Sequence, residues 1–303
     1  MNRCAQVVAD GCVSSLAALI ERSGGVRLDA LTFNSSLKYS CLYDPAISIE
    51  ITSPSQFEVV EFAAGVVVSN VPAISSARLS DFFLGATRVK RQHDAALALK
   101  KSSGVSAWML VSAYYCAYFA SLELAKIFGR FSMSLEAEEL SLLQQKATGP
   151  DHAEFFQAGH ANFSGSEFAG KLVFRAIGTR PHASAWENAR FALRRVLGEK
   201  AWPEAVRFLE LIENQSCAPN VIRNTWNYKR ADFYGGVGEA KASEFRKLLG
   251  NAGGVYSWLQ QRRGRLPDLE PCAIAVLCEG LAEPIADAAS RAKELLRLQT
   301  VAG

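Results

Sequence analysis

Apolar and polar positions follow different periods along the chain, and the first hundred residues differ from the rest. The spacing over Cys4–Arg22 predicts a helix that ends before a pair of glycines. Ala46–Thr52 alternates apolar and polar residues and is rich in β-branched types, which is typical of a half-buried strand. Phe57–Asn70 predicts a second long strand, or two short strands around Gly65. Together these elements predict a small N-terminal α/β region.

The pattern changes after Pro72. We expect Pro72 to close the α/β region and to lead into a polar stretch, Ala86–Lys101. The apolar segment Val105–Phe128 then predicts a long helix with a stop signal at Gly129. Small residues recur at every fourth position of this segment, at Ser112, Cys116 and Ala120. Such a stripe favours the close approach of another helix.

The same segment has to be compared with a membrane span. Val105–Leu122 carries no formal charge over eighteen residues, which reaches the lower length limit of a transmembrane helix. Serines and tyrosines dilute the segment, and the tyrosines fall in its middle, where a span prefers Leu and Val. The sequence therefore favours a central buried helix of a bundle, and a membrane-associated protein is the alternative.

Most of the remaining chain has helical periodicity, apart from a loop-rich centre over Pro150–Pro181. A helix is predicted to begin at Ser134 and to run to Lys146. After the centre, helical patterns recur at 185–197, 204–214, 221–233, 239–249 and 255–265, with two more stretches between Pro267 and Leu298.

Composition limits the function classes. The chain has 303 residues, 49% hydrophobic and 21% charged, which predicts one large or two moderate globular domains. The net charge of +3 is too small to produce a strong positive electrostatic field over the whole protein. Charge alone therefore does not indicate nucleic-acid or membrane binding, and any basic site is local. The seven cysteines are scattered without CxxC pairs and are interpreted as buried thiols. With no secretory pattern around Asp10, a cytoplasmic location is expected.

Three of the four histidines lie in the central segment, at His152, His160 and His182. A metal enzyme that used them with Asp151 or Glu154 is one alternative. No HxH or HxxxH pair places two ligands on one element, so we interpret them as turn or surface residues and expect no metal and no cofactor.

Familiar catalytic signatures are missing from the sequence. We find no GxGxxG after a strand, no GxxxxGK[ST], no HExxH and no GxSxG. Gly235–Gly238 is rich in glycine but follows no strand, and we interpret it as a linker.

One polar run stands out, RNTWNYKR at Arg223–Arg230. On a helix, Arg223, Asn227 and Arg230 share one side at i, i+4 and i+7. Asn224 then lies beside Asn227, with Tyr228 one turn on. Guanidinium, amide and phenol donors together suit a phosphate group. The alternative is that these residues cap and cross-link a helix bundle with Trp226 in its core.

The pairing of a tyrosine-rich helix, WMLVSAYYCAYFASLELAKIFG, with RNTWNYKR resembles the HEPN superfamily of helical-bundle domains. The resemblance covers roughly Ala95–Leu249. It implies a metal-independent ribonuclease site in which two copies meet across a homodimer and arginine stabilises the phosphate while the RNA 2′-hydroxyl attacks. It implies these site residues: Arg223, Asn224, Asn227 and Tyr228 as catalytic, and Lys229 and Arg230 as RNA-binding.

The chain departs from the family motif at its histidine. Asn227, Tyr228 and Lys229 stand in the expected window, and no histidine follows His182. Asparagine is no general base, and an unperturbed tyrosine has a pKa near 10. Three groups could then act as the general base. The first is Tyr228, if its pKa is lowered beside Lys229. The others are a histidine such as His160 or His182 that the fold brings back to the site, or a group supplied by a partner.

The sequence as a whole predicts an α+β chain, mostly α, with a HEPN-like bundle. Its expected regions are an N-terminal α/β region at 1–95, the bundle at 96–250 and a helical extension at 251–303. The expected function is a ribonuclease acting on RNA, tRNA included, as a homodimeric toxin or phage-defence effector restrained by an antitoxin or partner protein. The alternative is a non-catalytic HEPN-like module that binds a nucleotide or a partner.

Overall fold

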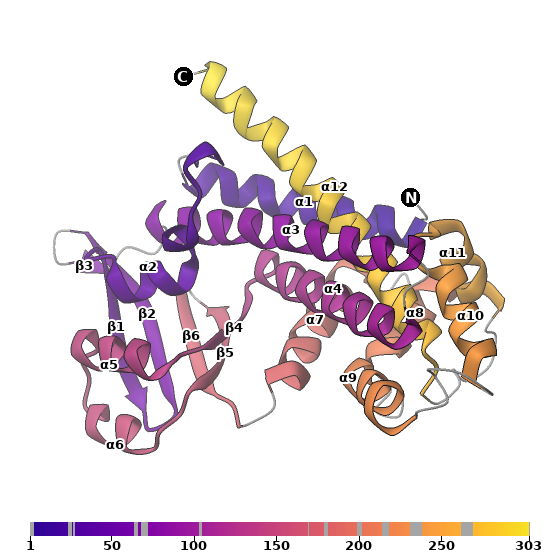
Figure 1. Ribbon diagram of the computed structural model, residues 1–303. Helices are drawn as coiled ribbons and strands as arrows, with labels where there is room; N and C mark the ends of the chain where they lie inside the picture. Colours follow the sequence, from indigo (N-terminus) through magenta and orange to yellow (C-terminus); the bar gives the residue numbers. More distant parts are fainter. Residues whose placement is uncertain are drawn as a thin grey trace. The chain divides into compact units, whose positions relative to one another are not determined.

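The computed structural model describes residues 3–23, 26, 28–63, 66, 67, 72–102, 105–168, 170–178, 181–198, 202–213, 218–230, 238–261 and 269–302. The described chain is a mostly helical α+β protein (Figure 1). It divides into two compact units. Unit 1 comprises Met1–Val13, Gly85–Leu124 and Trp186–Ser290, and unit 2 comprises Ser14–Leu84, Ala125–Ala185 and Arg291–Gly303. These units do not follow the predicted boundaries at residues 95 and 250.

Five helices contribute residues to both units. They are α1 (Arg3–Ser23), α3 (Pro72–Lys101), α4 (Ser106–Ile127), α7 (Pro181–Leu197) and α12 (Cys272–Ala302). The predictions of α1 and α4 are confirmed to within one or two residues, and Gly129 follows the end of α4 with φ +74°. The two helical stretches predicted near the C-terminus form one helix, α12.

An antiparallel sheet forms the centre of unit 2. Its strands are β1 (Ile47–Ser53), β2 (Gln56–Ala63), β3 (Val66–Val67), β4 (Arg130–Ser134), β5 (Asn162–Phe168) and β6 (Lys171–Ala176). The order is β1-β2-β6-β5-β4, with β3 paired to β2. The predicted strand at Ala46–Thr52 is confirmed as β1, and the next prediction is found as β2 and β3, while residues 64, 65 and 68–71 lie outside the described part. The sheet therefore joins the N-terminal strands to a segment more than one hundred residues later.

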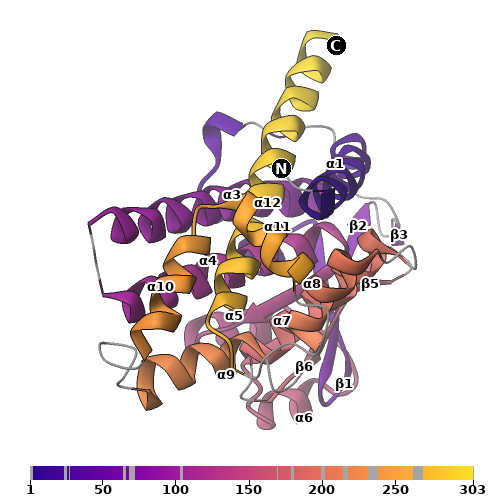
Figure 2. The same cartoon turned by 90° about the vertical axis from the view of Figure 1, so that its right-hand side faces the viewer.

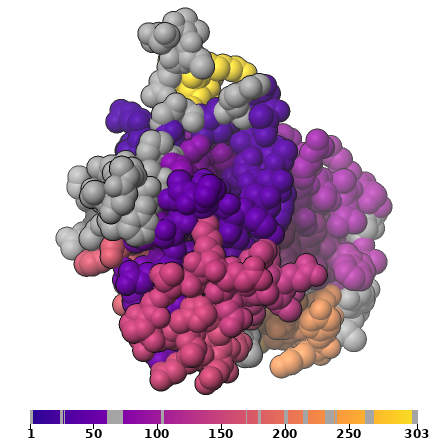
Figure 3. Space-filling model, turned by 90° about the vertical axis from the view of Figure 1, so that its left-hand side faces the viewer, coloured from indigo at the N-terminus to yellow at the C-terminus, as the bar shows by residue number. Residues whose placement is uncertain are grey.

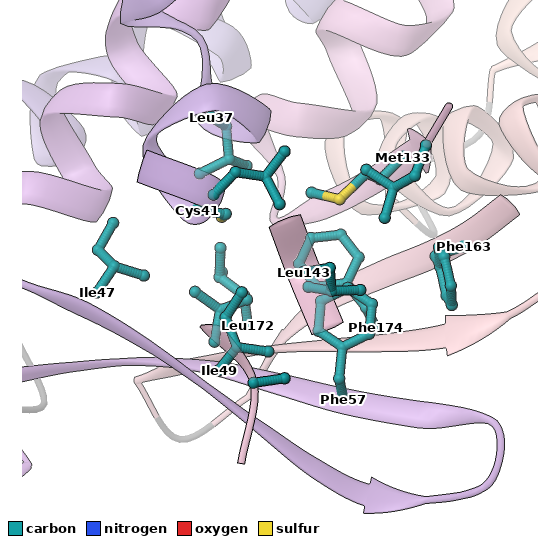
Figure 4. Close-up of a cluster of buried hydrophobic side chains, with 14 of the residues drawn as sticks. Leu37, Cys41, Ile47, Ile49, Phe57, Met133, Leu143, Phe163, Leu172 and Phe174 are labelled. Carbon is teal, nitrogen blue, oxygen red and sulfur yellow. The ribbon is translucent and has the colours of Figure 1, made fainter. Parts of the chain in front are cut away.

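One face of this sheet carries the hydrophobic core of unit 2. Alternation along β1 places Ile47, Ile49 and Ile51 on this face, where each is almost fully buried. The rings of Phe57 and Phe174 stack there with centroids 4.9 Å apart, from paired positions of β2 and β6 (Figure 4). Three helices cover this face and contact β1: α2 (Leu37–Tyr43), α5 (Ala137–Lys146) and α6 (His152–Gln157). The segment that holds α5 and α6, in pink, forms a continuous outer surface in Figure 3.

The predicted loop-rich centre at Pro150–Pro181 is wrong, because it contains α6, β5 and β6. The inward positions of β5 are Phe163 and Gly165, so a single large apolar residue marks that strand in the sequence. The helix predicted from Ser134 is also misplaced, because Ser134 is the last residue of β4. α5 begins at Ala137 instead, where the carboxylate of Glu139 accepts a hydrogen bond from the backbone of the capping residue before the helix.

The expectation for Pro72 is also wrong. Pro72 opens the 30-residue helix α3, and the polar stretch Ala86–Lys101 is its second half. Proline suits the first turn of a helix because the missing N–H has no partner there in any case. Within unit 1, α3 buries Val89 and Ala96 and leaves its charged side chains at the surface, which explains the polar appearance of the segment.

The regular secondary structure in the described part of unit 1 is all helical. Besides its share of the five long helices it contains α8 (Pro203–Glu213), α9 (Pro219–Asn224), a π-helical turn (Thr225–Lys229), α10 (Glu239–Leu248) and α11 (Ala252–Gln261). α8, α10 and α11, in orange, gather beside α12 in Figure 2, and Gly280 of α12 lies against the ring of Phe208 of α8. Residues 235–237 of the predicted linker lie outside the described part.

α4 is a buried helix of unit 1, as predicted. Met109, Leu110, Ala113, Cys116 and Ala117 are all fully buried. Its small-residue stripe faces α3, because Gln92 Nε2 donates a hydrogen bond to the Ser112 hydroxyl at 2.9 Å and the Cys116 thiol lies 3.8 Å from the carbonyl of Val89.

Length and hydropathy select a different helix as a membrane candidate. Among the described residues, α1 is the one helix that meets both criteria, with 44% of the apolar window buried. A core helix of a soluble protein meets the same criteria, so this is weak evidence for a span.

Candidate functional site

The two segments that carry the HEPN resemblance lie against each other in unit 1. The guanidinium of Arg223, on α9, lies 4.8 Å from the ring centroid of Tyr114 and 5.6 Å from that of Tyr115, both on α4. Pro219 opens α9 at its first turn and Ile222 is fully buried, so the short helix is fixed in place beside the tyrosines. We call Arg223, Tyr114 and Tyr115 the Arg223 cluster.

Tyr114 is the buried member of this cluster. Burial raises the pKa of its phenol to about 12, and the nearby side chains of Trp186 and Arg223 act in the opposite direction. The phenol is therefore protonated at neutral pH. A protonated phenol beside a guanidinium is a pair of hydrogen-bond donors, which suits an anionic ligand.

One donor of Arg223 has no acceptor. Its Nε is buried and makes no hydrogen bond within the part of the chain that the structure describes. A buried donor without a partner costs free energy, about 1–3 kcal/mol and more for a charged group. An unpaired buried donor of this kind is compatible with an acceptor ligand, although Arg78 Nε of unit 2 is unpaired among the described residues as well.

The run after Arg223 departs from a straight α-helix. Thr225–Lys229 forms a π-helical turn, which is frequent at functional sites, and Arg230 caps it outside helical geometry. Trp226 is buried and its Nε1 donates a hydrogen bond to the carbonyl of Leu269 at 2.5 Å, so the core position considered for this residue is confirmed. The guanidinium of Arg230 lies 4.5 Å from the Trp226 ring, so Arg223 and Arg230 contact different aromatic partners.

The other predicted site residues differ in exposure. Tyr228 is 72% exposed. Asn224 and Lys229 are exposed as well, while Asn227 is half-buried. The π-helical turn therefore offers an outer polar surface next to the half-buried Arg223.

A second arginine, which the sequence analysis missed, lies further along α4. The guanidinium of Arg88, from α3, lies 4.2 Å from the Phe119 ring centroid, and its Nη2 donates to Oε1 of the fully buried Glu123 at 3.1 Å. Burial raises the pKa of Tyr118, and the charge of Arg88 opposes this effect. The one sequence signal for this group is the carboxylate of Glu123 in an otherwise apolar helix.

The histidines considered as a replacement base stay a prediction, since the structure does not place unit 2 relative to the Arg223 cluster. His152, His160 and His182 all belong to unit 2. The histidine of unit 1, His93, lies 2.9 Å from Oε1 of Glu279 through its Nε2. Among the described residues, the groups with three ligand atoms close enough for a metal ion are His93–Cys278–Glu279 and Glu244–Glu270–Cys272. The second group already contains a cation, because Lys241 Nζ lies 2.6 Å from Glu270 Oε2.

No family model, curated protein or solved structure matches the chain. The resemblance to the HEPN superfamily therefore rests on the residues quoted for it. What the geometry adds is a half-buried guanidinium stacked on two tyrosines, with an orphan donor and exposed amide, phenol and ammonium groups on the next turn. Chemically, this arrangement can hold an oxyanion.

Proposed function

We propose that the Arg223 cluster binds a phosphate group of RNA and that the chain is a HEPN-like, RNA-directed effector module. The observation that supports this most directly is the buried Nε of Arg223, which has no acceptor among the described residues. A phosphate oxygen satisfies that donor once the Arg223 side chain shifts enough to uncover it, because the atom is buried in the described structure. The planar fork of arginine pairs with phosphate oxygens through parallel hydrogen bonds, which makes the pairing both strong and directional.

The surroundings of Arg223 favour a phosphodiester over a small carboxylate. Lys229 and Arg230 add positive charge on the adjacent turn, and both are exposed. Tyr228, exposed beside them, offers a ring on which a nucleobase can stack. A chain of phosphates with intervening bases uses all of these groups, whereas a lone anion uses Arg223 alone.

The chemistry of the cluster favours binding over cleavage. General base catalysis of 2′-hydroxyl attack needs a group that accepts a proton near neutral pH. Tyr114 holds its proton there, because burial raises its pKa to about 12. The one histidine in the sequence of unit 1 is bonded to Glu279. The proposed activity is therefore recognition of RNA.

Ribonuclease activity is the second candidate, and the contact between α9 and the tyrosine-rich α4 favours it. That contact pairs the same two helices as the HEPN resemblance. Arginine that stabilises the phosphate by charge and position accelerates cleavage even without a positioned base. In this version two copies of the chain form one site across a homodimer, and an antitoxin or defence partner in the cytoplasm restrains it.

One experiment separates the two candidates. Purified protein is incubated with total RNA and with tRNA, with and without chelator, and each sample is run on a native and on a denaturing gel. The parent is compared with Arg223→Ala, Tyr228→Phe and, as a matched control, Arg194→Ala, an exposed arginine of unit 1 paired with Glu213. We expect the parent and the control to shift RNA without cutting it, and Arg223→Ala to lose the shift.

The remaining outcomes are equally decisive. Cleavage that survives chelation and disappears in Arg223→Ala selects the ribonuclease, and Tyr228→Phe then shows whether the phenol takes the place of histidine. RNA that is neither shifted nor cut by the parent overturns both versions.

A further inference from the structure

A second cluster of chemically active side chains lies on the opposite side of α4 from Arg223. His93 of α3 and the neighbouring residues Cys278 and Glu279 of α12 place one ligand atom each within 4.8 Å of one another. Nε2 of His93 lies 2.9 Å from Oε1 of Glu279. Cys278 is fully buried, and the side chain of Glu279 is 8% exposed. The group is therefore an enclosed set of nitrogen, sulfur and oxygen atoms.

Cys116 of α4 supplies a fourth group. Its thiol is fully buried and hydrogen-bonds with that of Cys278; this contact, together with burial, raises the pKa of Cys278. The ligand atoms of His93, Cys278 and Glu279 thus lie together, and Cys116 of α4 is joined to them through its contact with Cys278.

This cluster is separate from the Arg223 cluster. Cys116 follows Tyr114 by two positions, and two positions turn an α-helix by about 200°. The two side chains therefore leave α4 on opposite sides. The phosphate-binding proposal uses one side of the helix and leaves the other unexplained.

We propose that His93, Cys116, Cys278 and Glu279 form a closed binding site for a divalent transition metal of the zinc class. Imidazole, thiolate and carboxylate are the three ligand types that Zn²⁺ uses in proteins, and four protein ligands without an open position are typical of a structural site. On binding, both thiols release their protons to solvent. The proton that Nε2 of His93 shares with Glu279 moves to Nδ1 or to solvent, so that the imidazole binds in its neutral form, and the imidazole and the carboxylate exchange their mutual hydrogen bond for bonds to the metal. The ion then ties α3, α4 and α12 together.

The chain offers a matched control for each thiol. Cys12, in the part of α1 that belongs to unit 1, is fully buried like Cys116 and Cys278, and it contributes no ligand to the proposed site. A buried cysteine replaced by alanine loses a similar packing volume at all three positions. Only at Cys116 and Cys278 does it also remove a proposed ligand.

The test begins with the full-length protein, kept reduced and purified without chelator. Its metal content is measured by elemental analysis, and the demetallated protein is titrated with Zn²⁺ and separately with Co²⁺. We expect one Zn²⁺ per chain, a rise in melting temperature on adding Zn²⁺, and a Co²⁺ spectrum with thiolate charge-transfer absorption and tetrahedral d–d bands. Cys116→Ala, Cys278→Ala and His93→Gln each weaken or abolish these signals, and Cys12→Ala retains them.

The folded state of each variant is checked by circular dichroism before titration. Should a ligand variant fail to fold, the Co²⁺ spectrum of the parent decides alone, since thiolate charge transfer requires cysteine at the metal. The proposal is overturned if the parent binds neither ion, if its Co²⁺ spectrum lacks thiolate absorption, or if Cys278→Ala binds as well as Cys12→Ala. None of these readouts involves RNA, so they do not depend on the proposed function.

Discussion

Replacing Gly85 with alanine tests the packing of α3 on α4, which places Arg88 beside Phe119 and Glu123. A Cβ atom at this position overlaps the carboxylate of Glu123. The Glu123 side chain is fully buried and bonded to Arg88 at 3.1 Å, so moving it aside separates a buried charge from its partner. Alanine is otherwise the better helix former here, by about 1 kcal/mol.

These effects have different sizes. Depriving one member of a buried ion pair of its partner costs about 3–5 kcal/mol of folding free energy. The side chain of Arg88 is 46% exposed, so solvent screens the pair and the lower end of that range applies. Subtracting the gain in helix propensity leaves an expected loss of roughly 2 kcal/mol for Gly85→Ala.

The assay is urea unfolding followed by circular dichroism, with Gly253→Ala as control. A Cβ at Gly253, also in a helix of unit 1, meets only Oδ1 of Asn251 at 3.7 Å, so we expect no loss of stability there. The double variant Gly85→Ala/Glu123→Ala removes the overlap, and its loss is expected to fall short of the sum of the single losses by about 1 kcal/mol or more. A Gly85→Ala variant as stable as the parent, or more stable, refutes the reasoning.

Two further predictions concern the Arg223 cluster and its anchor. The pKa of Tyr114 is raised from 10 to about 12, so between these values the unfolded chain loses a proton that the folded chain keeps, and stability falls as pH rises by up to roughly 3 kcal/mol. Tyr114→Phe removes this part of the fall in unfolding free energy with pH, measured by urea unfolding at pH 9–12. The same pH dependence in the variant and the parent contradicts the raised pKa of Tyr114. Trp226→Phe loses the hydrogen bond to Leu269 and part of the core volume, for an expected loss of about 1–3 kcal/mol in the same assay at pH 7; a loss below 0.5 kcal/mol would show that Trp226 does not anchor the turn.

The fold was predictable where local pattern and burial agree. β1 has buried residues at alternate positions, and α4 is apolar enough to read as a helix from the sequence. β5 was missed because Phe163 is the only large apolar residue on its inward face. Its pairing with β6 is a local hairpin, whereas its pairing with β4 joins segments about thirty residues apart. α3 was missed because its second half exposes charged side chains and buries mainly small ones.

The candidate site was predictable in part for the same reason. Arg223 and its neighbours form one short run, which the sequence shows directly. The resemblance drew attention to this run and to the tyrosine-rich segment, but the contact of Arg223 with Tyr114 and Tyr115 was not predicted. Arg88 and Glu123 lie 35 positions apart and meet only through helix packing. His93 and Glu279 are 186 positions apart, so no local motif such as CxxC or HxxxH could predict that they meet.

The most direct test of the proposed function is the affinity of a fluorescently labelled single-stranded RNA, measured by anisotropy over a series of salt concentrations. We predict that Arg223→Ala weakens binding about tenfold or more and lowers the salt slope by about one charge. Arg194→Ala is expected to stay within about twofold of the parent, because an exposed, carboxylate-paired arginine contributes little. An Arg223→Ala protein that binds RNA as tightly as the parent, with the same salt slope, contradicts the proposal.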